Sequence, residues 1–134
     1  MKIGELAEAT GCTVQAIRYY EEIQLLKPTQ RSEGNYRLYD KSAMERLMFI
    51  KQCRSLELAL SEIRVLLELI HCPGKKCDDV NLLVDSHIQQ IDDRIEALTN
   101  LRQQLSSLRR RCSSNRTVER CGILQNLAGS ANLL

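Results

Sequence analysis

A long apolar seam running from Val80 to Cys112 limits this chain to a small set of folds. Its members are separated alternately by four and three residues over four heptads, which is the spacing of a coiled-coil helix. The seam consists of Val80, Val84, His87, Ile91, Arg94, Leu98, Leu101, Leu105, Leu108 and Cys112, in which His87 is a polar position and Arg94 an interruption. A lone helix with such a stripe must bury it against a partner, and the preceding segments predict only short helices. The seam therefore predicts a homodimer.

Three cysteines bracket this predicted helix. Cys77 lies just before its start, Cys112 at its end, and Cys121 nine residues further on. A helix rises about 1.5 Å per residue, so residues 80–112 would span roughly 50 Å and would keep Cys77 and Cys112 of one chain apart. Two such helices that pair antiparallel would place the Cys77 of each chain beside the Cys112 of the other. The spacing predicts a thiolate site shared across a dimer.

The composition favours helices and a cytoplasmic location. Of the 134 residues, 43% are hydrophobic but only 4% are aromatic, a balance that suits helices better than large sheets. No cleavable signal opens the sequence, and no apolar run approaches the roughly 20 residues of a membrane span, so we expect no membrane partner. Six cysteines in the cytoplasm indicate metal or redox chemistry more than structural disulfides. With a net charge of only +2, any DNA binding must depend on where the basic residues lie.

The first 22 residues predict two short helices joined by a glycine-containing turn. Gly11 suits the C-terminal turn of the first helix, and Thr13 is a good N-cap for a second helix that runs to Glu22. This pattern is typical of a helix-turn-helix. The second helix would expose four side chains able to bond phosphates and base edges, namely Thr13, Gln15, Arg18 and Tyr19. The short pattern alone is equally consistent with a solvated helix face.

The following segment favours the DNA-binding interpretation. The triplet Leu26-Lys27-Pro28 is expected to end the second helix, and residues 31–39 predict a tight hairpin with its turn at 33–35. A hairpin that carries Arg31, Asn35 and Arg37 beside a recognition helix indicates a DNA-binding wing.

Two further helices are predicted before the seam. Asp40 can N-cap the first, and Ser61 can N-cap the second. In the first helix the residues expected to face the core are Met44, Leu47, Met48 and Ile50. The second helix carries the apolar residues Ile63, Leu66, Leu67 and Ile70.

Three linked motifs resemble the MerR family of transcription regulators. They are Ile3-Gly4-Glu5-Leu6-Ala7, Ile17-Arg18-Tyr19-Tyr20-Glu21, and Arg31 followed after three residues by Asn35-Tyr36-Arg37-Leu38-Tyr39. The similarity continues through Cys53-Arg54-Ser55-Leu56 and Leu60-Ser61-Glu62-Ile63. The resemblance implies operator contacts from the recognition helix by Thr13, Gln15, Arg18 and Tyr19, and from the wing by Arg31, Asn35, Tyr36 and Arg37.

The same resemblance implies a mainly α fold with two parts. Residues 1–75 would form the winged helix-turn-helix DNA-binding domain with its connecting helices. Residues 76–134 would form a long antiparallel coiled-coil dimerisation helix and a C-terminal metal-binding loop.

The C-terminal cysteines resemble those of the lead- and cadmium-responsive branch of this family. The loop from Ser113 to Glu119 could fold the thiolates of Cys112 and Cys121 around one ion, and residues 122–127 predict a short helix that closes it. In that branch a cysteine before the dimer helix joins two from the loop of the other protomer, which implies Cys77, Cys112 and Cys121 as ligands. Copper members lack a cysteine at the position of Cys77, and zinc members carry extra loop ligands.

The ligand count sets the expected ion preference. Ser113 follows Cys112 directly, and no histidine lies between positions 112 and 134. Three sulfurs suit soft ions that accept trigonal coordination, Pb(II) and Hg(II), and Cd(II) could add a water. Zn(II) normally takes four ligands and should bind more weakly.

The remaining cysteines carry less information. We expect Cys12 and Cys53 to act as small, buried hydrophobic residues. Cys72, next to His71, could be a spare ligand, a disulfide partner for Cys77, or unrelated to the site.

The resemblance implies a non-enzymatic, metal-responsive transcription regulator. Its dimer would bind double-stranded promoter DNA at a pseudo-palindromic operator, hold the promoter inactive without metal, and distort the DNA on metal binding so that RNA polymerase can engage it. A thiol-redox regulator of the same fold is the alternative, and metal titration under strict reduction separates the two. An enzyme would not need the wing, and no catalytic constellation is visible in the sequence.

Overall fold

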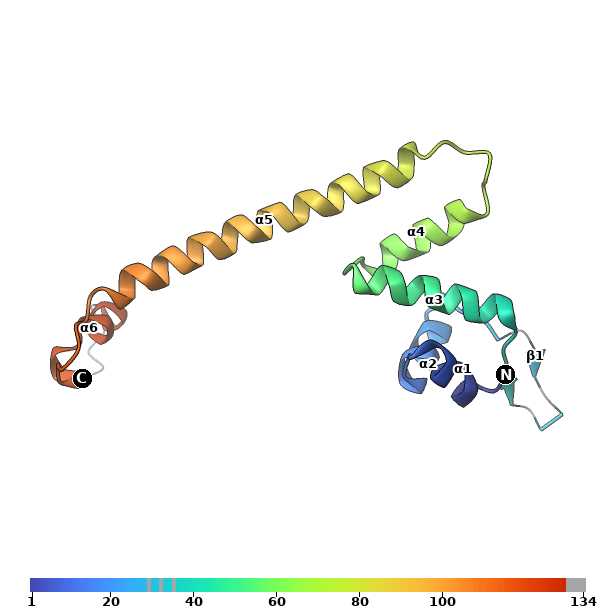
Figure 1. Ribbon diagram of the computed structural model, residues 1–134, viewed down its shortest axis with the longest axis horizontal. Coiled ribbons are helices and arrows are strands. Elements are labelled where there is room, and N and C mark those ends of the chain that lie inside the picture. The colour runs from blue at the N-terminus through green and yellow to red at the C-terminus, as the bar shows by residue number, and fades with distance from the viewer. Residues whose placement is uncertain (29, 32, 35, 130–134) are drawn as a thin grey trace. The chain divides into compact units, whose positions relative to one another are not determined.

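The computed structural model describes residues 1–28, 30, 31, 33, 34 and 36–129 (Figure 1). In chain order the elements are α1 (Ile3–Thr10), α2 (Val14–Glu22), β1 (Gln30–Arg31), β2 (Arg37–Leu38), α3 (Lys41–Ser55), α4 (Leu60–Ile70), α5 (Asp78–Arg109), the 3-10 helix η1 (Val118–Arg120) and α6 (Gly122–Ala128). The chain divides into two compact units, Met1–Leu83 and Val84–Leu134. A mainly helical fold with a two-stranded wing and one long helix confirms the predicted fold class.

The helix-turn-helix forms from local capping chemistry. Gly11 ends α1 in the left-handed region at φ 73°, which favours glycine, and its N–H donates to the Ala7 carbonyl over 2.9 Å. The Thr13 hydroxyl oxygen accepts the Ala16 N–H over 3.0 Å and starts α2. Both features agree with the sequence-based prediction.

Helix α2 ends at the predicted residue, but not through the proline that was expected to end it. The helix stops at Glu22, and Gln24 takes a left-handed conformation at φ 64° before the chain reaches Leu26-Lys27-Pro28. The N–H groups of Leu25 and Leu26 both donate to the Tyr20 carbonyl, over 2.8 and 3.2 Å. This reversal buries both leucines, so packing ends the helix before proline is reached.

The wing is a short antiparallel pair anchored to the N-terminus. Strand β1 pairs with β2 in the register Gln30↔Leu38 and Arg31↔Arg37. Met1 and Tyr39 exchange two hydrogen bonds: the Met1 amino group donates to the Tyr39 carbonyl over 2.8 Å, and the Tyr39 N–H donates back over 2.7 Å. These bonds fasten the base of the hairpin to the segment that leads into α1.

Helices α3 and α4 correct two details of the prediction. Asp40 N-caps α3 through the Ala43 N–H over 2.9 Å, as expected. The N-cap of α4 is Ala59 and not Ser61, because the Glu62 carboxylate reaches back to accept the Ala59 N–H over 2.8 Å. Met48 was expected in the core but is 51% exposed, because the buried face of α3 passes through Ala43, Leu47, Ile50 and Cys53 instead.

Two apolar clusters hold these helices together. The first contains Leu6, Ile17, Leu26, Tyr39, Ala43 and Leu47, and the second contains Leu25, Ile50, Cys53, Leu58, Ile63 and Leu67. The side chain of Tyr20 packs against both clusters. One face of α2 therefore packs against both apolar clusters, and the opposite face of α2 is exposed to solvent.

The long helix α5 carries apolar side chains that its own chain leaves exposed. Ile88, Ile95, Leu98, Leu101 and Leu105 are each about half exposed or more. The helix ends at Arg109, three residues before Cys112, so that cysteine lies in the turn beyond the helix. None of the helices within the described residues combines the length and apolarity that a membrane crossing requires.

Candidate metal centre and nucleic-acid interface

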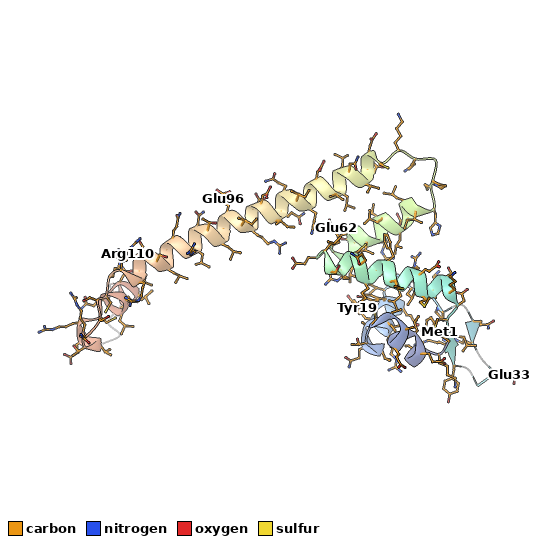
Figure 2. The ribbon with its side chains drawn as sticks, viewed as in Figure 1. Met1, Tyr19, Glu33, Glu62, Glu96 and Arg110 are labelled. Carbon is orange, nitrogen blue, oxygen red and sulfur yellow. The ribbon has the colours of Figure 1, made fainter. Side chains whose placement is uncertain are left out.

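The N-cap and the solvent-facing side of α2 carry the four predicted recognition residues. Thr13, Gln15, Arg18 and Tyr19 are all exposed, and Figure 2 labels Tyr19 among them. Ile17 and Tyr20, on the opposite side, pack into the core. The helix therefore presents a hydroxyl, an amide, a guanidinium and a phenol together to solvent, which are groups that bond phosphates and base edges.

The wing contributes two arginines and a tyrosine. Arg31 is exposed, Arg37 is half-buried, and Tyr36 is 62% exposed. The Lys2 ammonium nitrogen lies 5.0 Å from the centroid of the Tyr36 ring, close enough for a cation–π contact. Asn35, the remaining predicted wing residue, lies outside the described residues.

A basic cavity joins the recognition helix to the wing. It has a volume of about 490 Å³, and its charged lining consists of Arg18, Lys27, Arg31 and Arg37 together with Glu21 and Glu22. Arg37 Nη1 lies 3.2 Å from Glu21 Oε2, so an ion pair links β2 to α2. Sequence reasoning missed Glu21, although it lies inside one of the quoted motifs, because its role depends on a residue 16 positions away.

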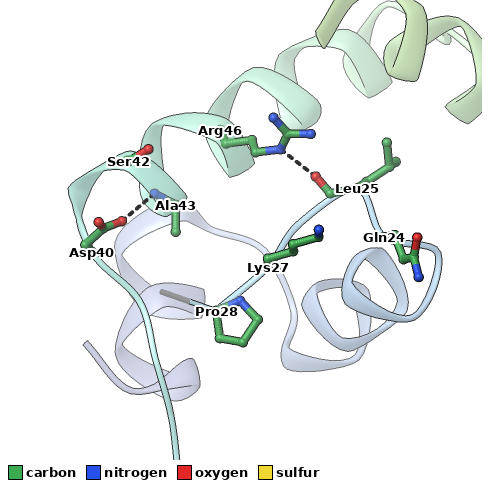
Figure 3. Close-up of a pocket in the computed structure, with 8 residues that line it drawn as sticks. All are labelled: Gln24, Leu25, Lys27, Pro28, Asp40, Ser42, Ala43 and Arg46. Atoms are coloured by element: carbon green, nitrogen blue, oxygen red, sulfur yellow. Dashed lines mark hydrogen bonds between the residues drawn. The ribbon is translucent and has the colours of Figure 1, made fainter. Parts of the chain in front are cut away.

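A second cavity shows how the segment after α2 is held (Figure 3). It has a volume of about 420 Å³, and Lys27 and Pro28 border it as well as the basic cavity. Arg46 of α3 donates its Nε–H to the Leu25 carbonyl over 2.6 Å. This bond holds the backbone that leads to Lys27, so the polar groups of the cavity stabilise the N-terminal unit.

The C-terminal loop brings Cys112 and Cys121 together. Arg109 Nη1 donates to the Cys112 carbonyl over 2.8 Å and so holds the turn after α5. Cys121 is the N-cap residue of α6, and the backbone amide of Leu124 lowers the pKa of its thiol. The Cys112 side chain and the Ile123 amide lower this pKa further, whereas burial opposes them. Two adjacent sulfurs, one of them favoured as thiolate, fit a soft metal ion.

Hydrogen bonds within the loop support this arrangement. Arg116 Nε donates to Ser113 Oγ over 3.0 Å, and Gln125 Nε2 donates to the Glu119 carbonyl over 3.2 Å. Gly122 allows α6 to approach the end of the long helix, because a Cβ there would collide with the backbone carbonyl oxygen of Arg111. Sequence reasoning did not single out Gly122, since nothing in the local pattern reports this approach.

Cys77 lies in the other unit, exposed and directly before α5. It lines an apolar cavity of about 370 Å³ together with Cys72, Phe49 and Leu66 among others. Within the described residues of one chain, no three His, Cys, Asp or Glu side chains form a group that could hold a metal. One chain thus pairs two of the three predicted ligands.

Cys12 and Cys53 have the surroundings expected of small hydrophobic residues. Cys12 packs against the first core cluster, and Cys53 is 6% exposed within the second. Burial raises the pKa of the Cys53 thiol, which disfavours a thiolate there.

The fold and these features define a class, the helix-turn-helix regulators with a wing and a long helix. Within that class, the chain belongs to the MerR family. Residues 1–70 match the model of the MerR HTH family regulatory protein, and residues 44–108 match the MerR, DNA binding model.

Relatives and solved structures of the same family cover nearly the whole chain. The HTH-type transcriptional regulator ZntR homolog of Haemophilus influenzae is 44% identical over 115 residues, which are 86% of this chain and 85% of the relative. The mercuric resistance operon regulatory protein of Bacillus cereus is 35% identical over 126 residues, 94% of this chain and 96% of the relative. The crystal structure of the regulator PbrR691 from Ralstonia metallidurans, in complex with lead(II), has a TM-score of 0.88 at 48% identity and covers 96% of this chain and 99% of its own.

Proposed function

We propose that this chain is a homodimeric, metal-responsive transcription regulator that binds a pseudo-palindromic promoter operator. Residues 1–75 bind DNA, and residues 76–134 form the dimer and sense a soft divalent ion. Thr13, Gln15, Arg18 and Tyr19 contact the operator from α2, and Arg31, Asn35, Tyr36 and Arg37 contact it from the wing.

The observation that carries the sensing role is the pairing of Cys112 with Cys121. Their side chains interact, and the pKa of Cys121 is lowered, chiefly by the Leu124 amide. Soft ions bind thiolates, so the loop offers two ready ligands. The third ligand is the partner's Cys77, which an antiparallel pairing of α5 would bring to the loop. The exposed apolar side chains of α5 support that pairing, because dimerisation would bury them.

Three thiolates without a fourth ligand favour Pb(II), Cd(II) or Hg(II) over Zn(II). The similarity to a relative solved with lead(II) supports this choice. When bound, the ion supplies a cross-link between the protomers. Metal binding can shift the dimer between two conformations only if they differ in affinity for the ion. A site built from both chains provides such a difference, because its geometry depends on how the two chains are placed. The favoured conformation would distort the operator so that RNA polymerase can engage the promoter.

Gly122→Ala should weaken metal binding while leaving operator binding intact. The added Cβ would meet the Arg111 carbonyl oxygen, so α6 must move and carry Cys121 away from Cys112. Residues that orient metal ligands typically affect affinity by about 10- to 100-fold, and we expect a loss in that range. Competition titration against a chelator of known affinity measures it. Gly4→Ala is the matched control, because a Cβ at Gly4 meets nothing within 4 Å. Equal metal affinities in the two variants would contradict the proposed role of the loop.

Transcription in vitro from the cognate promoter tests the function itself. Under strict reduction, Pb(II), Cd(II) or Hg(II) should activate, Zn(II) should act more weakly, and Cu(I) should be poorest, because three sulfurs suit the first group. Activation by a peroxide with no metal present would favour the thiol-redox alternative. Zn(II) binding at least as tight as Cd(II) would contradict the three-sulfur site and point to a fourth ligand, with His71 or Cys72 the first to test.

A further inference from the structure

Glu21 is a carboxylate on a surface that must attract phosphate. It lies in the last turn of α2, and its side chain is 8% exposed. The cations Arg18, Lys27, Arg31 and Arg37 line the same cavity, as does the exposed Glu22, but it is Glu21 that is buried against Arg37. A negative charge among them weakens the attraction for a phosphate backbone, so charge alone does not explain a glutamate here.

The contact made by Glu21 joins two elements that must act together on DNA. Its Oε2 atom lies 3.2 Å from Arg37 Nη1, which links the end of α2 to the first residue of β2. By contrast, the ion pair between Lys41 and Glu45, at 3.8 Å, joins two exposed side chains of the same helix, α3, and so links no separate elements. The wing strands are only two residues long, so a side-chain link to α2 adds directly to what orients them.

The surroundings of Glu21 make it depend on its arginine neighbours. Burial raises the pKa of Glu21, and the charges of Arg37, Arg31 and Arg18 oppose that rise. The Oε1 atom is buried and has no hydrogen-bond partner among the described residues. A buried carboxylate that loses its main cationic partner is strongly disfavoured, so the pair with Arg37 is maintained.

The pair leaves Arg37 able to bind a phosphate. The Arg37 side chain is 41% exposed and contacts Glu21 through Nη1. A guanidinium has five N–H donors, so others remain for a phosphate oxygen. A side chain already ordered before binding loses less conformational entropy when DNA arrives. Such order matters most where the wing and recognition helix must both fit one sequence, whereas non-specific binding needs mainly positive charge.

We propose that Glu21 is a positioning residue that holds Arg37 in register with the recognition helix and thereby gives operator binding part of its selectivity over other DNA. This inference rests on the proposed function. It predicts that Glu21 strengthens specific binding but does not strengthen non-specific binding. A carboxylate that merely repelled phosphate would weaken both.

Fluorescence anisotropy with two duplexes tests the proposal. One duplex is enriched from a random-sequence pool by the wild-type protein, and the other has the same length and composition in shuffled order. Glu21→Gln is nearly isosteric and removes only the charge. It should lower affinity for the enriched duplex about two- to tenfold, the range for ordering one side chain at an interface, and leave shuffled-duplex affinity equal or higher. Glu22→Gln removes the other carboxylate that borders the cavity, on an exposed neighbour in the same helix, and should not lower affinity for the enriched duplex.

A double-variant cycle shows whether Glu21 acts through Arg37. In an Arg37→Gln background, Glu21→Gln should cause no further loss, because the side chain that it positions is already gone. Tighter binding of both duplexes by Glu21→Gln, or an unchanged loss in the Arg37→Gln background, would overturn the inference. Thermal unfolding of each variant identifies misfolding, and the double variant, which removes both charges, keeps the comparison valid if one single variant is unstable.

If the wild-type protein enriches no duplex, the proposed function fails and this inference with it. If it does and Glu21→Gln matches wild type on both duplexes, only the inference fails.

Discussion

A mixture of a Cys77→Ser chain with a Cys112→Ser chain should bind metal, although neither homodimer should bind one tight equivalent. Serine is nearly isosteric with cysteine but is a poor ligand for soft ions, so each homodimer lacks one sulfur at both sites. In the heterodimer one site is complete, with Cys112 and Cys121 from the first chain and the partner's Cys77. Thiolate-to-metal charge-transfer absorption and direct metal analysis report its appearance on mixing, with Pb(II) as the probe.

The control mixture combines Cys112→Ser with Cys121→Ser chains. Both ligands belong to the same loop, so neither site of that heterodimer is complete and mixing should give no gain. A verified Cys77→Ser and Cys112→Ser heterodimer that gains no metal would overturn the shared site. The 32-residue helix α5 rises roughly 50 Å, which makes a site within one chain incompatible with an unbroken helix. If Cys72→Ser loses metal and Cys77→Ser does not, Cys72 is the ligand from that segment.

Arg18→Ala and Arg37→Ala should each weaken operator binding while leaving metal stoichiometry unchanged. Arg18 is exposed on α2, and Arg37 lies on the wing beside the same basic cavity. Loss of a good base contact costs about 1–3 kcal/mol, or roughly five- to 150-fold in affinity. Loss of a phosphate contact also reduces the dependence of affinity on salt by about one unit of slope.

Binding titrations across a salt series separate these two roles. Arg37→Ala also leaves the Glu21 carboxylate without its cationic partner, so its thermal unfolding must be measured beside Arg18→Ala. Wild-type affinity and salt dependence in both variants would remove these arginines from the operator interface.

Local chemistry made much of the DNA-binding unit predictable. Gly11 and Thr13 mark the helix-turn-helix because a left-handed turn and an N-cap each depend on one residue and its immediate neighbours. The same reasoning placed Asp40 correctly and failed at Ser61, because the Glu62 carboxylate satisfies the Ala59 N–H and starts α4 earlier. Met48 was misplaced because helical spacing restricts which residues share a face but does not show which face the core will cover.

The residues of the candidate site also fall into those that the sequence predicted and those that it did not. The cysteine spacing predicted a loop holding Cys112 and Cys121, and the structure brings the two side chains together. Neither Glu21 nor Gly122 was identified, because the first acts through Arg37 and the second through the Arg111 backbone. Each role is defined by a neighbour that folding supplies.

Periodicity, capping and residue chemistry act over a few positions, so the sequence alone predicts the α-helices, the wing hairpin and the thiols that flank the long helix. The folded structure was needed to show which face of α3 is buried, which carboxylate meets the wing arginine, and how closely α6 approaches the end of α5. Those outcomes depend on close packing between residues distant in the chain, where a single Cβ or a single charge changes what can fit.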